Sequence, residues 1–258
     1  MNSLINGKAL AWDIMGSKYW DSGYNGGPSP RDIQKYLDKI DKNKRVAVIG
    51  ASTVNLIKAA LESDLNITVI DFSEKMCNCL AKELLPQKCN IVHHDITKPV
   101  PEFLHNKFDY ILADRLINRF TEIEIRKAFK EVLQLLNDNG IFRTSIRLGL
   151  YKRDMPFISE GKKRGTLHNF FDEETWIIDY SKCDDILDEF ISPHGEISKD
   201  TLVEFYRLRG PEKRLRASDI ENYVNSIALQ DKCLKILSTE TLPDVTDDLL
   251  YSFQVKNL

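Results

Sequence analysis

The sequence predicts an α/β fold, a doubly wound and mostly parallel sheet of seven strands that finishes with an antiparallel strand. Short β-branched runs alternate with helix-periodic segments from residue 45 to 146, which requires a parallel sheet covered by helices on both faces. Near the end of the chain, two apolar runs at 234–238 and 250–255 are joined by a polar segment without room for a crossover helix. Such a connection favours an antiparallel pair.

The first half of the predicted sheet follows from local patterns. Residues 45–49 form a short β-branched run that ends at Gly50, which is typical of a buried parallel strand. Residues 54–63 repeat apolar side chains at helical spacing, and residues 67–70 form the second strand. Ser73 then stands in the N-cap position of a further helix.

The second half continues the alternation. The third strand is expected at 89–93 and the fourth at 108–113, each followed closely by an acidic residue. A helix over 122–136 is expected to stop at the polar run 137–140, because Asn and Gly residues favour helix ends and turns. The fifth strand follows at 141–146.

Composition excludes several classes of function. The chain has 258 residues and a net charge of −3, so it has no overall attraction for nucleic acid or anionic membranes. Five cysteines fit neither a zinc ribbon nor a secreted disulfide framework, and adjacent histidines at 93 and 94 point to opposite faces of a strand. No apolar run approaches the roughly 18 residues that span a bilayer. We expect a cytoplasmic protein without a metal site, and a small-molecule partner.

Two segments lie outside the predicted sheet. We expect residues 1–40 to form an N-terminal lid or substrate segment, and residues 41–258 to form the domain that holds the sheet, interrupted by an insertion at 147–216. The N-terminal segment is rich in aromatic residues and glycines, which suits a lid over a ligand, with Tyr19 and Tyr24 as contacts. A simple packed cap is the alternative.

The turn after the first strand predicts a nucleoside site. Gly50 starts a turn that opens a helix, and Asp71 ends the second strand 21 residues later. A turn without bulky side chains lets backbone N–H groups face a ligand, while a carboxylate at the neighbouring strand tip accepts hydrogen bonds from both ribose hydroxyls.

In these motifs the chain resembles the class I S-adenosylmethionine-dependent methyltransferases, which have a Rossmann-like fold. The family's first turn, acid-x-G-x-G-x-G, aligns with residues 48–54, and its acids after strands two, three and four align with Asp71, Asp95 and Asp114. The resemblance implies S-adenosyl-L-methionine as cofactor. The binding positions that it implies lie at the strand tips and are Gly50, Ala51, Ser52, Asp71, Phe72, Ser73, Met76, Asp95, Ile96, Asp114 and Arg115.

The first turn departs from the family pattern. The family's first-turn acid helps to hold the methionine ammonium of the cofactor, and here that position is Val48. Ser52 replaces a glycine, although its hydroxyl can donate a hydrogen bond to a carboxylate. Another residue must therefore supply the ammonium contact, or the ligand differs.

Residues 114–119 leave the fourth strand where the family places the transferred methyl group. Asp114 or Asn118 could orient a nucleophilic amine or hydroxyl, whereas Arg115 or Arg119 could bind a substrate carboxylate bidentately. Structural salt bridges are the alternative. We take Asp114, Asn118 and Tyr19 as the catalytic candidates.

The insertion carries two basic clusters, at 162–164 and 207–216, which are either solvated surface or a site for a carboxylate, a phosphate or a carrier protein. The same insertion contains four residues that could act as a base near neutral pH, namely His168, Tyr180, His194 and Tyr206, and the sequence does not choose among them. Together with Tyr24 and Arg119, His168 is a candidate for substrate binding.

Three functions follow from these patterns. The first is methyl transfer from S-adenosylmethionine to an N, O or C nucleophile of a small molecule. The second is alkyl transfer or cyclisation with the same cofactor, which would release methylthioadenosine. The third is a non-catalytic nucleoside-binding protein of the same fold. The sequence does not fix the oligomeric state, and a dimer is compatible with it.

Overall fold

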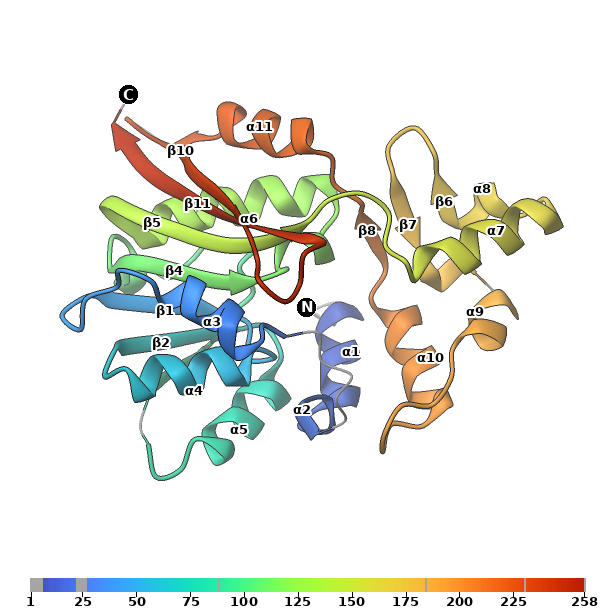
Figure 1. Cartoon of the computed structure of the whole chain (residues 1–258), viewed down its shortest axis with the longest axis horizontal. Helices are drawn as coiled ribbons and strands as arrows, with labels where there is room; N and C mark the ends of the chain where they lie inside the picture. Colours follow the sequence, from blue (N-terminus) through green and yellow to red (C-terminus); the bar gives the residue numbers. More distant parts are fainter. Residues whose placement is uncertain (1–6, 22–26, 88, 184, 230, 258) are drawn as a thin grey trace, which may run out of the picture.

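The computed structural model describes residues 7–21, 27–87, 89–183, 185–229 and 231–257. Its centre is a sheet of eight strands in the order β3-β2-β1-β4-β5-β11-β10-β9 (Figure 1). These strands are β1 (Arg45–Ile49), β2 (Asn66–Asp71), β3 (Asn90–His93), β4 (Phe108–Asp114), β5 (Leu136–Arg147), β9 (Ala228–Leu229), β10 (Lys232–Thr241) and β11 (Asp248–Asn257).

The predicted fold class is confirmed. Strands β1 to β5 pair in parallel, whereas β11 pairs antiparallel with both β5 and β10. The two-residue strand β9 adds an eighth strand at the edge, beyond the seven that the sequence predicts.

The polar run 137–140 follows the end of helix α6 (Glu122–Leu135), as the sequence predicts, and it forms the irregular start of β5. Asn139 has a φ of 62°, and the pairing with β4 passes from Phe108 opposite Leu136 to Tyr110 opposite Ile141, so residues 137–140 bulge out of the regular ladder. The side-chain amide of Asn137 donates to Asp109 on β4 at 2.8 Å, and the register with β4 shifts between Phe108 and Tyr110. This cross-strand bond satisfies a polar side chain within the sheet.

Helices cover both faces of the sheet, as the alternating pattern requires. Helices α6 and α11 (Ala217–Ser226) pack on one face, and α3 (Pro30–Leu37), α4 (Val54–Glu62) and α5 (Glu74–Glu83) pack on the other (Figure 1). Successive β1 residues alternate between the two cores, with Ala47 in the first and Val48 in the second. The side chain of Ser73 accepts a hydrogen bond from the Met76 amide, which confirms the predicted N-cap of α5.

The segment between β5 and α11 contributes to a hydrophobic core of its own, beside the two cores on the faces of the sheet. Its elements are α7 (Asp154–Arg164), α8 (Leu167–Phe170), β6 (Phe171–Asp172), β7 (Ile177–Asp179), α9 (Asp185–Phe190), α10 (Lys199–Leu208) and β8 (Pro211–Lys213). Strands β6, β7 and β8 pair in a small separate sheet.

The N-terminal helices join this region to the main sheet. Helix α1 (Gly7–Met15) packs its buried Ala11 and Met15 into the core that α10 helps to form, and it also contacts α5 (Figure 1). A Cβ atom at Gly7 would lie 3.0 Å from the Leu208 carbonyl oxygen, which shows how closely α1 and the end of α10 approach. Helix α2 (Lys18–Asp21) follows. Within the described residues, none of the helices has the length and apolar character needed to cross a bilayer.

Candidate active site

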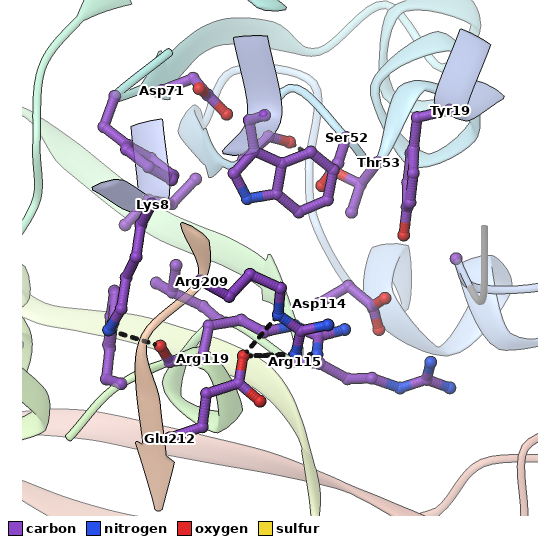
Figure 2. A pocket seen from close by; sticks show the side chains of 17 residues that line it. Lys8, Tyr19, Ser52, Thr53, Asp71, Asp114, Arg115, Arg119, Arg209 and Glu212 are labelled. Carbon is purple, nitrogen blue, oxygen red and sulfur yellow. Dashed lines mark hydrogen bonds and ion pairs between the residues drawn. The ribbon is translucent and has the colours of Figure 1, made fainter. Parts of the chain in front are cut away.

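A cavity opens at the carboxyl ends of β1, β2 and β4, with α1 and α2 on one side and the residues before β8 on another (Figure 2). Including the open space at its mouth, the empty volume of the cavity is about 790 Å³. Its wall combines aromatic residues such as Trp12 and Phe120 with several charged side chains. Three separate parts of the chain therefore meet around one concave site.

Asp71 and the turn at Gly50 form the first part of the wall. Gly50 has a φ of 108°, a conformation that favours glycine. The Asp71 carboxylate is 6% exposed and accepts one backbone N–H at each oxygen, from Ala51 and from Ser73, both at 2.7 Å. Each carboxylate oxygen has a second acceptor position, so this fixed carboxylate can still receive hydrogen bonds from a ligand.

Burial governs the protonation of Asp71. Desolvation raises the pKa of this carboxyl to about 6, although the hydrogen bonds from the Ser73 and Ala51 amides act in the opposite direction. The group is therefore ionised at neutral pH and becomes protonated in mildly acidic solution.

A smaller hollow continues from this point along the sheet edge. It shares Gly50, Asp71 and Phe72 with the main cavity and adds Asp95 and Ile96. One oxygen of Asp95 accepts hydrogen bonds from the backbone N–H of Thr97 at 2.9 Å and from its hydroxyl at 2.7 Å. Asp95 therefore caps the turn after β3, and it also lines the hollow.

Asp114 at the tip of β4 is held by a buried polar network. Its Oδ1 atom accepts hydrogen bonds from the Tyr36 hydroxyl at 3.1 Å and the Ser145 hydroxyl at 2.6 Å. Burial raises the pKa of Asp114, while the positive charge of Arg115 lowers it. Among the described residues, no hydrogen bond engages its Oδ2 atom, so this oxygen is available to a ligand in the cavity that Asp114 lines.

Arg115 contributes both its backbone and its side chain. Its φ of 49° lies in the left-handed region, and its backbone N–H donates to the Ser145 hydroxyl at 2.9 Å. Its guanidinium forms an ion pair with Asp248, which is fully buried and also pairs with Arg147 at 2.5 Å. The salt-bridge alternative therefore describes Arg115 in this structure.

The opposite wall is a buried ionic cluster. Glu212 is 1% exposed and accepts from Arg209 Nε at 2.8 Å and from Arg214 Nη1 at 3.1 Å, while Arg119 Nη1 lies 3.8 Å away. Burial alone would raise the pKa of Glu212, but the positive charges of these arginines lower it to about 2. Glu212 is ionised throughout the physiological range.

Comparisons with known proteins agree with this architecture. A family model described as "Methyltransferase domain" matches residues 46–140, which hold β1 to β4, α6 and the start of β5. A methyltransferase from Clostridium acetobutylicum, described as S-adenosylmethionine-dependent, has the same fold with a TM-score of 0.57 at 14% identity, over 92% of this chain and 96% of that one. The chain has the class I S-adenosylmethionine-dependent methyltransferase fold.

A second methyltransferase structure extends the comparison. It is the 1,6-didemethyltoxoflavin-N1-methyltransferase of Burkholderia thailandensis, solved with 1,6-didemethyltoxoflavin and S-adenosylhomocysteine. Its TM-score is 0.59 at 10% identity, over 96% of this chain and 88% of that one. At this identity the likeness shows a shared class I methyltransferase fold. No curated protein sequence matches the chain.

A more similar structure carries a different name. It comes from Rhodobacter sphaeroides and is described as a putative Zn-dependent alcohol dehydrogenase; identity is 38%, the TM-score is 0.90, and 98% of this chain and 100% of that one are covered. Across the residues with described positions, no group of three or more His, Cys, Asp or Glu side chains could hold a metal ion. The antiparallel β11 beside β5 is the arrangement of class I methyltransferases, and the domain model that matches residues 46–140 describes a methyltransferase domain.

Most of the predicted site residues gather at this cavity. Those that line it are Tyr19, Gly50, Ser52, Asp71, Phe72, Asp114, Arg115 and Arg119, and Asp95 and Ile96 line the adjoining hollow. The strand tips bring them together because β1, β2, β3 and β4 are parallel and end at one edge.

Three of the predicted cofactor-binding residues lie beneath the surface of the cavity and do not line it. Ala51 is fully buried and uses its backbone N–H to hold Asp71. Ser73 is also fully buried; its hydroxyl caps α5 and donates to Asp13 on α1 at 2.5 Å. Met76 packs in the core between α5 and the sheet. These residues shape the site without lining the cavity.

The structure contradicts two placements. Asn118 is 1% exposed, and its amide donates to the Arg147 carbonyl at 2.8 Å and accepts from the Arg147 N–H at 3.0 Å. Both ends of the side chain join the turn after β4 to β5, so Asn118 does not face the cavity. His168 is exposed on α8 and lines a separate groove with Gly161 and Lys162. The predicted contact of Tyr24 lies outside the described residues.

The sequence patterns missed several lining residues. Lys8 and Trp12 come from α1, Thr53 from the start of α4, and Glu212 from β8. Trp12 belongs to the aromatic segment that suggested a lid, and Arg209 belongs to a basic cluster that suggested an anion site. Lys8 and Glu212 carry no local signal, because only the packing of α1 and the insertion against the sheet brings them to the cavity.

Proposed function

We propose that this chain transfers the sulfonium methyl group of S-adenosylmethionine to a small molecule held in the cavity. The observation that carries the proposal is the Asp71 carboxylate, fixed by two backbone amides beside the Gly50 turn. This is the position at which the methyltransferase family binds the ribose. The adjoining hollow at Asp95 and Ile96 would take the adenine.

Asp114 is the proposed partner of the methionine ammonium. Val48, which replaces the family's first-turn acid, is fully buried in the core and cannot contact a ligand. Asp114 lies one strand away, since Ala113 pairs with Ile49 in the register of β1 and β4. Its Oδ2 atom is available, and a buried carboxylate favours a cationic partner. The negative charge missing from β1 is therefore present on β4.

The residues of the chain mainly position the reactants. When bound, the cofactor supplies an activated methyl group, so the protein must hold the acceptor atom in line with it. Such positioning is worth roughly 7–11 kcal/mol in well-oriented reactions. Tyr19 and Trp12 form one side of the cavity, with their rings 4.8 Å apart in an edge-to-face contact, and exclude water from that side. Tyr19 and Asp114 are the proposed groups that orient the acceptor.

The substrate side of the site is proposed to come from residues 1–40 and the insertion 147–216. Helix α1 contributes Lys8 and Trp12, and the insertion contributes Arg209 and Glu212. The contact between α1 and α10 joins these two segments, so they would act together as the cover of the domain formed by the rest of residues 41–258.

Product analysis tests the proposal. The purified protein is incubated with S-adenosylmethionine and a panel of small amines, phenols and carboxylates, and the adenosyl product is identified by mass spectrometry. S-Adenosylhomocysteine together with a methylated acceptor is expected. Methylthioadenosine would instead indicate alkyl transfer or cyclisation. Absence of S-adenosylhomocysteine binding by calorimetry would refute both reactions.

A further inference from the structure

Arg119 differs from the other cations of the cavity wall. It ends the short 3-10 helix η2 (Ile117–Arg119), and the Lys8 ammonium donates to its carbonyl oxygen at 2.9 Å, which fixes its backbone. Its side chain is 31% exposed, and its Nη1 atom lies 3.8 Å from Glu212 Oε1. Within the described part of the chain, this long ion pair is its one side-chain interaction with a carboxylate.

The remaining cations of the wall already have close carboxylate partners. Lys8 pairs with Glu124 at 2.6 Å, and Arg115 pairs with the buried Asp248. Arg209 donates two N–H groups to the same Oε1 atom of Glu212 that Arg119 approaches. Glu212 Oε1 already accepts two hydrogen bonds from Arg209, so its contact with Arg119 at 3.8 Å is the longest of the three.

The charges around Glu212 do not balance. The cluster contains the three guanidinium groups of Arg119, Arg209 and Arg214. It contains two carboxylates, Glu212 and Asp154, the second of which receives two hydrogen bonds from Arg214. Among the described residues, this cluster has one more guanidinium group than carboxylates, and a partly buried charge without a close partner is unfavourable. A ligand anion at Arg119 would neutralise it.

Building on the proposed methyltransferase function, we infer that the methyl acceptor carries a carboxylate that binds the Arg119 guanidinium. The planar fork of an arginine matches a carboxylate in geometry as well as charge. Trp12 and Phe120 line the same cavity, so an apolar or aromatic body beside the anion would also be accommodated.

The position of Arg119 favours the acceptor over the cofactor as the source of this carboxylate. Figure 2 shows Ser52 and Thr53, which belong to the cofactor turn, on one side of the cavity and Glu212 on the other. Arg119 lies beside Glu212. The methionine carboxylate of the cofactor is the other possible source, and the experiment must separate the two.

The test compares carboxylates with their neutral amides on protein saturated with S-adenosylhomocysteine. Benzoate and 2-naphthoate are titrated against benzamide and 2-naphthamide by calorimetry, using the wild type, Arg119→Gln and Arg126→Gln. Arg126 is the control because its guanidinium pairs with Glu122 on the surface of α6, outside the cavity. The wild type and the control should bind at least one carboxylate about tenfold or more tightly than its amide, as one charged hydrogen-bonded contact provides. Arg119→Gln should lose this preference.

Two results would overturn the inference. One is a wild type that binds no carboxylate of the panel better than its amide, or a preference that Arg119→Gln retains. The other is a selective loss of S-adenosylhomocysteine affinity in Arg119→Gln while methylthioadenosine, which lacks the amino-acid carboxylate, still binds as in the wild type; Arg119 would then hold the cofactor. Failure of the wild type to bind S-adenosylhomocysteine at all would instead refute the proposed function.

Discussion

Replacing Asp71 by asparagine tests the nucleoside site at its most constrained residue. In the wild type, both carboxylate oxygens accept a backbone N–H at 2.7 Å. Asparagine keeps one acceptor and places an NH₂ group against the other amide, which leaves a buried donor unsatisfied at a cost of about 1–3 kcal/mol in the free energy of unfolding. It also removes one charge-assisted contact to the ribose, worth about 1.5–3 kcal/mol. The Kd for S-adenosylhomocysteine should therefore rise by about 10- to 100-fold.

Calorimetric titration with S-adenosylhomocysteine measures this change, and thermal unfolding without ligand measures the stability term separately. Asp64→Asn is a matched control, because Asp64 lies just before the opposite end of β2 in an exposed ion pair with Lys42. Its φ of 56° is a conformation that asparagine tolerates. A folded Asp71→Asn protein that binds S-adenosylhomocysteine within twofold of the wild type would refute the ribose assignment.

Four further predictions concern the same framework. Because burial raises the pKa of Asp71 to about 6, the affinity for S-adenosylhomocysteine, measured by calorimetry, should fall as the pH drops below 6. The unliganded protein should instead gain stability from this group, since the folded carboxyl takes up a proton at a higher pH than the unfolded one. An affinity that stays constant between pH 7 and 5 would contradict this prediction. Gly50→Ala forces a side chain onto a φ of 108° and should lower the free energy of unfolding, measured in urea, by about 1–3 kcal/mol. Asn118→Ala should cost about 1–3 kcal/mol of stability by unpairing two backbone groups of β5, with kcat unchanged in the folded protein; a large loss of kcat at unaltered stability would restore a catalytic role. Asp248→Asn removes the buried negative charge that pairs with Arg115 and Arg147, and it should lower the free energy of unfolding in urea by about 3–5 kcal/mol. A change below about 1 kcal/mol would show that these ion pairs are dispensable for stability.

Local patterns in the sequence were enough to predict the sheet and the edge at which the cofactor positions meet. Strands such as β1 and β2 are short β-branched runs bounded by turn residues, and these signals are local. Once the strands are parallel, Gly50, Asp71 and Asp114 must meet at one edge, because the carboxyl ends of parallel strands lie together. The resemblance to methyltransferases was readable for the same reason.

The residues on the wall around Glu212 could be assigned only from the tertiary structure. Asn118, Arg115 and Arg119 are close neighbours of similar polarity in the sequence, yet one joins two strands, one pairs with Asp248, and one faces the cavity beside Glu212. These roles depend on partners more than 90 residues away or, for Asn118, on the backbone of β5. Contacts between distant segments leave no periodic pattern in the sequence. The role of Arg119 therefore became distinct from those of Arg115 and Asn118 only once the packing of α1 and the insertion against the sheet was known.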